Sequence, residues 1–428
     1  MKHGAIVCLS LALALPAAAQ DRVLDLENKF EILSQEVERL KLGEAAEPEA
    51  LDKPQIGSGR APAATKVYRT AAQKVSIGGY GEMSYQNFSK RNQKAGTAGV
   101  RDEADFLRAV LYTGYKFNDR ILFNSELEAE HGSTGKGRGE VSVEQAYIDF
   151  RFFEPLSARI GLVLVPMGFI NEIHEPTTFH GVKRPSVETN VIASTWRENG
   201  AGVLGDWGML AYRSYVLCGL QAVANTGVTG FSASSALRNG RSSGAKSLAE
   251  DLAWVGRADV TPVAGVTAGA SLYTGEADQG LAVSAVPVTL WELHAQAEHA
   301  GAELRALYAE GRVGNADTVN GLNGLTDAAQ TSVGRRLFGG YVQGAYDILA
   351  LLGSRQYLAA FLRYERYDTQ ADTPASFSKN PANSRVEYTL GLTYKPIPQT
   401  AVKADYQWNR NQARTGIDQF NLGLAYIF

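Results

Sequence analysis

The chain has 428 residues, 45% of them hydrophobic, and carries a formal net charge of −3. This length suffices for two ordinary domains or for one large all-β domain. The slightly acidic charge argues against a nucleic-acid-binding protein, which would be basic overall, so nucleic acid is not expected among its partners.

The first 19 residues have the pattern of a secretory signal peptide. A basic start, MKH, precedes the apolar stretch GAIVCLSLALAL and the small residues PAAAQ, so cleavage is expected after Ala19. The apolar stretch is shorter than the roughly 20 residues of a membrane-spanning helix, which argues against a membrane anchor. Cleavage removes Lys2 and Cys8 and leaves 41 basic and 45 acidic residues, a net charge of −4. Cys218 is then the one cysteine, so no intrachain disulfide is expected.

Residues 20–42 are predicted to form a short coiled coil in the periplasm. Apolar residues recur at spacings of three and four, the a/d pattern of heptads, at Val23, Leu26, Phe30, Leu33, Val37 and Leu40. In a parallel pairing, Arg22 meets Glu27 of the neighbouring helix. Three heptads alone are marginal, so another part of the chain must hold the helices together. The alternative is an amphipathic helix that packs on its own domain. Residues 43–73, rich in Ala, Pro, Glu and Gly, form a predicted linker.

Beyond the linker the hydrophobic period changes to two, which predicts β-strands with one apolar and one polar face. In KVSIGGYGEMSYQNF, one face holds Val75, Ile77, Met83 and Tyr85, and the other holds Ser76, Tyr80, Glu82, Ser84 and Gln86. About 16 such segments occupy residues 74–428, this first one included, an even number as in outer-membrane barrels. No later apolar run is long enough for a transmembrane helix, so a helical membrane protein is excluded.

Two kinds of connection alternate between the predicted strands. Tight turns are expected at 117–120, 153–157, 205–208, 261–265, 299–302, 351–354 and 395–399. Long polar loops are expected at 89–102, 131–139, 222–250, 277–286, 314–335, 368–384 and 409–415. Short turns at one end and long loops at the other are typical of an outer-membrane barrel.

The predicted fold is all-β, a transmembrane antiparallel barrel of about 16 strands over residues 74–428, because lipid tolerates only helices and closed sheets. A water-soluble sandwich would also alternate, but the signal peptide, the turn asymmetry and the final segment FNLGLAYIF favour the barrel. Phe428 is expected to close the barrel against the first strand, with its ring in outer-membrane lipid. A terminal aromatic residue also resembles the signal that the outer-membrane assembly machinery reads.

The longest non-alternating stretch early in the barrel is residues 165–200, which follow the fifth predicted strand. A loop of this length has a role or is disordered, and its aromatic and aliphatic residues argue against disorder. Just before it, VSVEQAYIDFRFFEPLSARIGLVLVPMGF at 141–169 resembles the signature of the phosphate-selective porin O and P family, with Met167 where that family usually has phenylalanine. The resemblance implies a trimeric barrel of about 16 strands whose third external loop, about 168–200, folds inward.

The resemblance also implies a pore constriction lined by charged residues. The candidates are Lys183, Arg184, Glu188 and Arg197 from the loop and Arg108, Glu126, Glu128, Arg151 and Arg159 from the strands. Rings of charge set the selectivity of pores, but phosphate binding needs clustered Arg and Lys with few competing carboxylates. These mixed charges therefore leave anion selectivity open, and the alternative for each residue is a solvated or cross-strand-paired charge.

The expected function is that of an outer-membrane porin, a homotrimeric passive channel for small hydrophilic solutes, with preference for anions such as phosphate left open. No catalytic residue, cofactor or metal site is expected. GAGVLG at 200–205 matches G-x-G-x-x-G, but another predicted strand follows it instead of the helix that a dinucleotide site needs. The alternatives are a structural tether that binds peptidoglycan through the coiled coil, and a barrel hydrolase that acts on lipids.

Overall fold

The computed structural model describes Ala64 and residues 74–428, except 136–137 and 154. The predicted signal peptide, the coiled coil and, apart from Ala64, the linker lie outside the described residues. All described residues belong to one compact unit, Lys53–Phe428.

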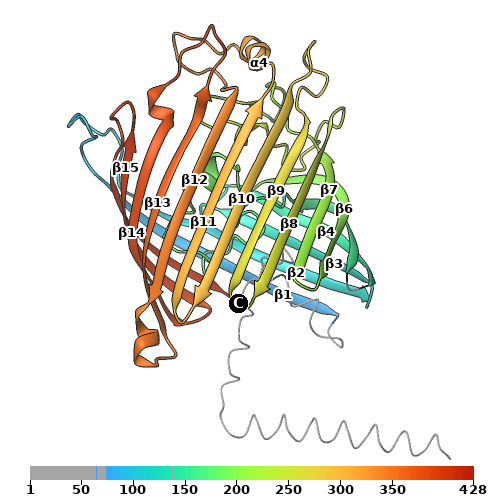
Figure 1. Ribbon diagram of the computed structural model, residues 1–428, viewed down its shortest axis with the longest axis vertical. Helices are drawn as coiled ribbons and strands as arrows, with labels where there is room; N and C mark the ends of the chain where they lie inside the picture. Colours follow the sequence, from blue (N-terminus) through green and yellow to red (C-terminus); the bar gives the residue numbers. More distant parts are fainter. Residues whose placement is uncertain (1–63, 65–73, 136–137, 154) are drawn as a thin grey trace, which may run out of the picture. The chain divides into compact units, whose positions relative to one another are not determined.

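Sixteen antiparallel strands form a closed barrel, which confirms the predicted fold class (Figure 1). The strands are β1 (Val75–Phe88), β2 (Glu103–Asn118), β3 (Ile121–Glu130), β4 (Val141–Phe153), β5 (Leu156–Leu164), β6 (Arg197–Trp207), β7 (Leu210–Cys218), β8 (Leu252–Val263), β9 (Val266–Glu276), β10 (Pro287–His299), β11 (Ala302–Val313), β12 (Arg336–Asp347), β13 (Tyr357–Asp372), β14 (Ser384–Ile397), β15 (Thr400–Asn411) and β16 (Gln419–Ile427). Each strand pairs with its neighbours in the sequence, and β16 pairs with β1 to close the sheet.

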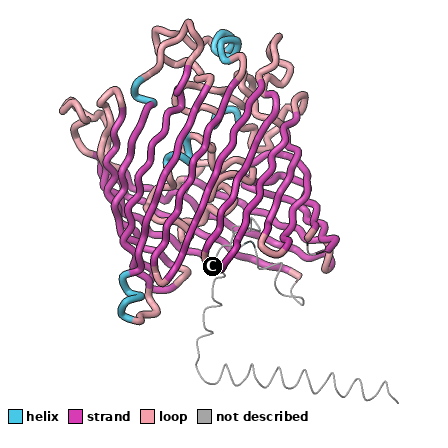
Figure 2. Tube along the Cα trace, in the orientation of Figure 1, coloured by secondary structure: helices cyan, strands magenta, loops and turns pink. Residues whose placement is uncertain are grey.

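The helices of the described residues are short and lie in the connections (Figure 2). They are α3 (Ser186–Asn190), α4 (Ala316–Leu322) and the 3₁₀ turns η4 (Arg238–Gly240), η5 (Ile348–Leu352) and η6 (Pro381–Asn383). Among these residues we find no helix with the length and apolarity that crossing a bilayer requires.

The connections alternate in length as predicted. Short connections occupy 119–120, 154–155, 208–209, 264–265, 300–301, 348–356 and 398–399. Long connections occupy 89–102, 131–140, 165–196, 219–251, 277–286, 314–335, 373–383 and 412–418. All long connections therefore lie at one end of the strands or fold back from that end.

The outer face of the barrel is apolar. On β14, Leu390 and Leu392 are about half exposed, whereas Thr389 and Thr393 are buried on the inner face. This arrangement is the reverse of a water-soluble sandwich, whose apolar faces would be buried, so that alternative is excluded. The segment GAGVLG lies within β6, without a helix after it.

The last residue closes the barrel. Backbone hydrogen bonds join Phe428 and Gly79 in both directions, at 2.9 and 3.0 Å, and Tyr80 is paired with Ile427. A Cβ atom on Gly79 would lie 2.9 Å from the Phe428 ring and 2.2 Å from the Val110 carbonyl oxygen, so only glycine leaves room for the terminal ring. The predicted closure by Phe428 is confirmed.

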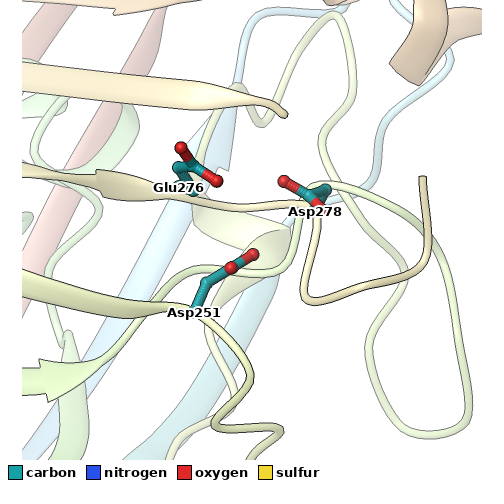
Figure 3. Close-up of side chains that lie close together, drawn as sticks. All are labelled: Asp251, Glu276 and Asp278. Atoms are coloured by element: carbon teal, nitrogen blue, oxygen red, sulfur yellow. The ribbon is translucent and has the colours of Figure 1, made fainter. Parts of the chain in front are cut away.

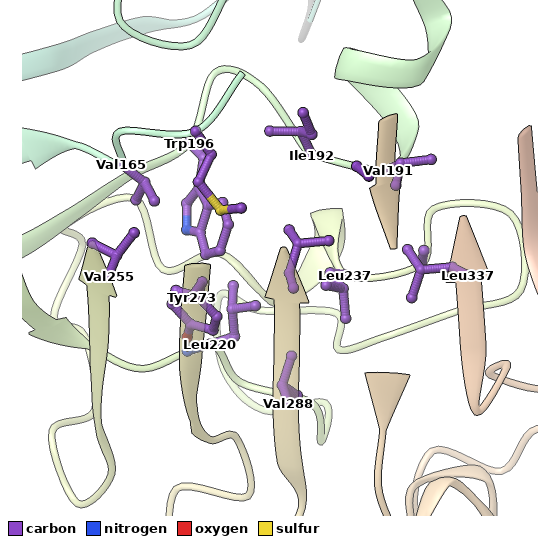
Figure 4. Packing of buried hydrophobic residues seen from close by; sticks show 14 of the residues in the cluster. Val165, Val191, Ile192, Trp196, Leu220, Leu237, Val255, Tyr273, Val288 and Leu337 are labelled. Atoms are coloured by element: carbon purple, nitrogen blue, oxygen red, sulfur yellow. Dashed lines mark hydrogen bonds between the residues drawn. The ribbon is translucent and has the colours of Figure 1, made fainter. Parts of the chain in front are cut away.

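Part of the barrel interior is apolar (Figure 4). Inward residues such as Val255, Tyr273 and Val288 are buried against Trp196 and Leu237, which come from two long connections. The prediction of a polar inner face is therefore wrong for these strands. The reason is that loops fold inward and supply apolar partners, which makes inward apolar side chains favourable.

Candidate functional site

Two long connections fold into the barrel, the first inner loop (residues 165–196) and part of the second inner loop (residues 219–251), whose Leu220, Phe231 and Leu237 are buried. Most residues of the first inner loop are buried, although it is a connection between strands. The predicted range of about 168–200 included the start of a strand, because β6 already begins at Arg197. The first inner loop crosses the lumen and is held by charged side chains from several parts of the wall.

Side chains of β15 bind the backbone of the first inner loop. Lys403 Nζ donates hydrogen bonds to the carbonyl oxygens of Phe179 (2.7 Å) and Gly181 (2.9 Å). Two residues further along β15, Asp405 Oδ2 accepts a hydrogen bond from the Val182 amide (2.6 Å). Hydrogen bonds to charged groups are stronger than neutral ones. Both inward side chains therefore hold the loop in place, and their charged atoms are bound to its backbone.

Carboxylates also hold α3, the short helix of the first inner loop. Its N-cap residue is a proline without a side-chain cap, but Glu365 Oε2 of β13 accepts from the Val187 amide (3.1 Å). This carboxylate supplies the acceptor that a helix N-terminus needs. Within the helix, Glu188 is fully buried and accepts from the Tyr341 hydroxyl and the Ile170 amide, both at 2.7 Å.

A buried charge network fixes the start of the first inner loop to β8 and β10. Arg257 donates to the Gly168 carbonyl oxygen and pairs with Asp259 at 2.8 Å. His294 bridges Asp259 (2.7 Å) and Glu292 (3.0 Å). Each basic side chain of this network contacts a carboxylate and each carboxylate contacts a basic side chain, as a buried charge network requires. The network is an anchor for the loop rather than a free charge in the lumen.

The second inner loop packs on the first through two arginines that the sequence analysis did not select. Arg241 Nη1 donates to the carbonyl oxygens of Ala193 (2.9 Å) and Thr195 (2.6 Å). Arg238 donates to the carbonyl oxygen of Ser194. These carbonyls follow α3 and have no helical partners, so the guanidinium groups satisfy them.

The two arginines add positive charge to the interior. Burial and the neighbouring Arg184 guanidinium lower the pKa of Arg238 to about 10. Burial and Arg238 itself lower the pKa of Arg241 to about 9. Both side chains therefore remain charged at neutral pH. The polar composition of residues 222–250 predicts an external loop. The sequence signal of an inward position is the presence of apolar residues in this segment, such as Phe231 and Leu237, and both are buried.

Most of the predicted lumen charges are buried in ion pairs. Arg108 contacts Glu82 and Glu128, each at 2.8 Å. Arg159 binds Asp149 through two hydrogen bonds of 2.8 and 2.9 Å. In each of these pairs both charges are neutralised by a side chain on a neighbouring strand. This is the alternative that the sequence left open for each candidate residue.

Three further predicted residues are also paired. Arg197 pairs with Glu144 of β4, and Glu126 contacts His174 of the first inner loop at 3.1 Å. The third, Glu188, is held within α3 and by β12. The structure therefore places these side chains in the wall and at the base of the loop, and a role in a constriction stays a prediction for each.

The remaining predicted residues are exposed or half-buried. Lys183 is exposed and Arg184 is half-buried, next to each other on the first inner loop. Lys183 lines a polar cavity of about 490 Å³ together with Ser186 and Asn190 of the same loop and with inward residues of β13 to β16. Arg151 is exposed near the short-turn end of β4, away from the first inner loop in the strand register.

Glu175 of the first inner loop is a buried carboxyl group with few hydrogen-bond partners. It is fully buried, the Tyr112 hydroxyl lies 3.5 Å from Oε1, and Oε2 has no hydrogen-bond partner among the described residues. Burial raises the pKa of Glu175 to about 7. Burial alone would lower the pKa of the neighbouring His174, but the Glu126 carboxylate raises it.

Replacing Glu175 by glutamine is expected to stabilise the barrel at pH 8 and not at pH 4. The carboxyl binds its proton more tightly in the folded state, so stability falls as pH rises from about 4.5 to about 7. The full penalty, on the order of 3 kcal/mol, is present above pH 7. Urea unfolding of the two proteins in lipid at both pH values measures it. Equal stabilities at pH 8 contradict the expectation.

Three carboxylates gather at the long-loop end of the barrel, Asp251, Glu276 and Asp278, with oxygens within 4.8 Å of one another (Figure 3). The Gln279 amide donates to Asp251, and the Val286 amide donates to Asp278 at 3.1 Å. These bonds shape the loops, and we assign no ion to the group. His174 and His180 contact different carboxylates, Glu126 and Glu303, and share no site.

Solved structures of outer-membrane porins have the same fold. OmpF of Salmonella typhi, in complex with daunomycin, is 13% identical with a TM-score of 0.56 and covers 84% of this chain and 98% of its own. The anion-selective porin of Comamonas acidovorans is 12% identical (TM-score 0.53; 83% and 99% covered). The channel DcaP of Acinetobacter baumannii is also 12% identical (TM-score 0.51; 83% and 97% covered). At these identities the likeness concerns the fold.

One protein is similar in sequence over nearly the whole chain. No family model matches the chain. A protein of Aquifex aeolicus (strain VF5), described as uncharacterized, is 35% identical over 387 residues, which cover 89% of this chain and 85% of that protein. The chain therefore belongs to the same family as this Aquifex aeolicus protein, and it has the porin fold.

Proposed function

We propose that the protein is an outer-membrane porin that lets small hydrophilic solutes diffuse through its barrel. The observation that carries the proposal is the closed barrel, apolar outside, whose lumen is crossed by the first inner loop. Such a loop narrows an aqueous path and sets a size limit. The second inner loop, packed on the first, narrows it further, so the conductance is expected to be small.

The experiment that tests this function is the conductance of the purified protein in planar lipid bilayers. A steady current that rises in three equal steps supports a trimeric porin, as the resemblance to phosphate-selective porins implies. The absence of any current from protein that is folded and inserted contradicts the proposal.

We further propose a mild preference for anions at the narrow part of the path. The acidic candidates are covered, since Glu126, Glu128 and Glu188 are 0%, 2% and 0% exposed. Of the cationic candidates, Lys183 is exposed and Arg184 is half-buried. Passing ions therefore meet positive charge first, which favours small anions, phosphate among them.

Replacing Lys183 and Arg184 together by glutamate is expected to shift the channel toward cations. Two charge reversals change the electrostatic free energy of an ion in the path by about 1 kcal/mol or more, which is roughly a fivefold change in the chloride-to-potassium permeability ratio. The reversal potential in a potassium chloride gradient measures this ratio. The matched control is Arg151→Glu near the short-turn end, which is expected to change it less. Equal shifts in both variants contradict the assignment.

A further inference from the structure

A groove lies on the outer wall of the barrel over β10 to β13, four strands that run side by side (Figure 1). Its volume is about 630 Å³. Small outward residues, Ala295, Ala306 and Gly340, form its floor, and Ala295 is directly paired with Ala306. Larger residues such as Tyr308 and Tyr364 form its sides. The lining of the groove is therefore largely apolar, which suits a hydrocarbon chain.

Arg366 lies at one end of this groove. It is exposed, faces outward from β13 and is paired with Gly340 of β12. Its guanidinium carbon lies 6.0 Å from the centre of the Phe338 ring. Arg336 lies over the same ring at 5.4 Å and forms an ion pair with Glu310 at 2.6 Å. Among the described residues, Arg366 has no ion-pair or hydrogen-bond partner, and this distinguishes it from Arg336.

Aromatic residues place this end of the groove at the level of lipid headgroups. Trp291 contacts Tyr308, and Tyr364 contacts Tyr388, with ring centres 5.5 and 5.2 Å apart. Outward aromatic girdles mark the boundary between hydrocarbon and headgroups in barrels. Trp291, Tyr308 and Tyr388 lie in the halves of their strands next to the long loops, and Tyr364, in the middle of β13, is paired with Tyr388, so this end of the groove faces the outer leaflet. An outward arginine at this level that has no ion-pair partner among the described residues is available to bind an anionic headgroup.

We propose that this groove binds a phosphate-bearing glycolipid of the outer leaflet. One acyl chain lies over Ala306 and Gly340, and a phosphate group binds Arg366, with the positive charge of Arg336 beside it. Arginine binds phosphate through two parallel hydrogen bonds, which suits a headgroup at a fixed position. The inference rests on the proposed placement of the barrel in the outer membrane.

The test measures binding of bisphosphorylated lipid A to the full-length protein in a neutral detergent, by native mass spectrometry. Arg366→Gln is expected to lower the affinity about tenfold, the loss expected for a charge-assisted hydrogen-bonded pair. Arg366→Lys keeps the charge and is expected to retain most of the binding. The matched control is Arg335→Gln, which removes an exposed arginine from the same end of the barrel, one that pairs with Asp372 instead. This control is expected to bind as the unchanged protein does.

A second variant and a second lipid test the groove itself. Gly340→Leu fills the floor and is expected to weaken binding although Arg366 is intact, while dephosphorylated lipid A is expected to bind weakly to every variant. Wild-type affinity in Arg366→Gln, or equal binding of dephosphorylated lipid A, overturns the proposal. Conversion of an oligomer to monomers by Gly340→Leu also overturns it, because the groove is then a subunit interface. Protein that is monodisperse without detergent and binds no lipid refutes the outer-membrane placement instead.

Discussion

Replacing Leu390 by arginine is expected to lower the free energy of unfolding of the barrel in a lipid bilayer by about 2–4 kcal/mol. Leu390 lies in the middle of β14 and is 50% exposed on the outer face. Its cross-strand neighbours, Leu362 of β13 and Tyr406 of β15, are also apolar and exposed. A guanidinium group placed here lies in hydrocarbon without a partner, on the short-turn side of the aromatic pair Tyr364 and Tyr388.

The matched control is Ile397→Arg at the end of the same strand. Ile397 is also 50% exposed, but it lies next to the short turn after β14, where an arginine reaches the headgroups and costs about 0–1 kcal/mol. Denaturant unfolding in vesicles of a neutral lipid measures both variants. A small and equal cost at the two positions means that no hydrocarbon surrounds the barrel, and the proposed function fails with it.

Local sequence pattern determines most of the fold. Side chains in a strand alternate strictly between two faces, so Val75 and Ile77 could be assigned to the outer face of β1, and both are exposed there. The number of strands could also be predicted, because turns and loops are marked by residues such as Gly, Pro, Asn and Asp between the alternating segments. Phe428 could be placed against β1 because a closed barrel leaves no free edge.

The use of the inner charges is a tertiary property and could not be predicted. Lys403 and Asp405 have the spacing of two inward residues, which is compatible with a charged pore wall. Only the structure shows that both bind backbone groups of the first inner loop. The position of Ala64 could not be predicted from composition either. This residue lies in the predicted linker, but it is buried, and its carbonyl oxygen accepts a hydrogen bond from the Asn124 side chain of β3 at 3.1 Å.

The largest change in conduction is expected from replacing Arg238 and Arg241 together by alanine. Their guanidinium groups join the second inner loop to carbonyl oxygens in the last turn of α3 and in the residues that follow it. Hydrogen bonds to charged groups contribute about 1.5–3 kcal/mol each, so losing both side chains weakens the contact by roughly 3 kcal/mol or more. Such a loss raises the population of detached loop about a hundredfold.

A detached second inner loop uncovers the first, so the small steady current is expected to become larger and to fluctuate between levels. Single-channel recording measures this, and the matched control is Lys246→Ala, which changes an exposed cation of the same loop. Because the first inner loop keeps its own contacts with Lys403, Asp405 and Glu365, the path widens without losing its narrowest segment. A double variant with the unchanged steady current shows that the second inner loop does not limit the path, and the first inner loop alone then sets it.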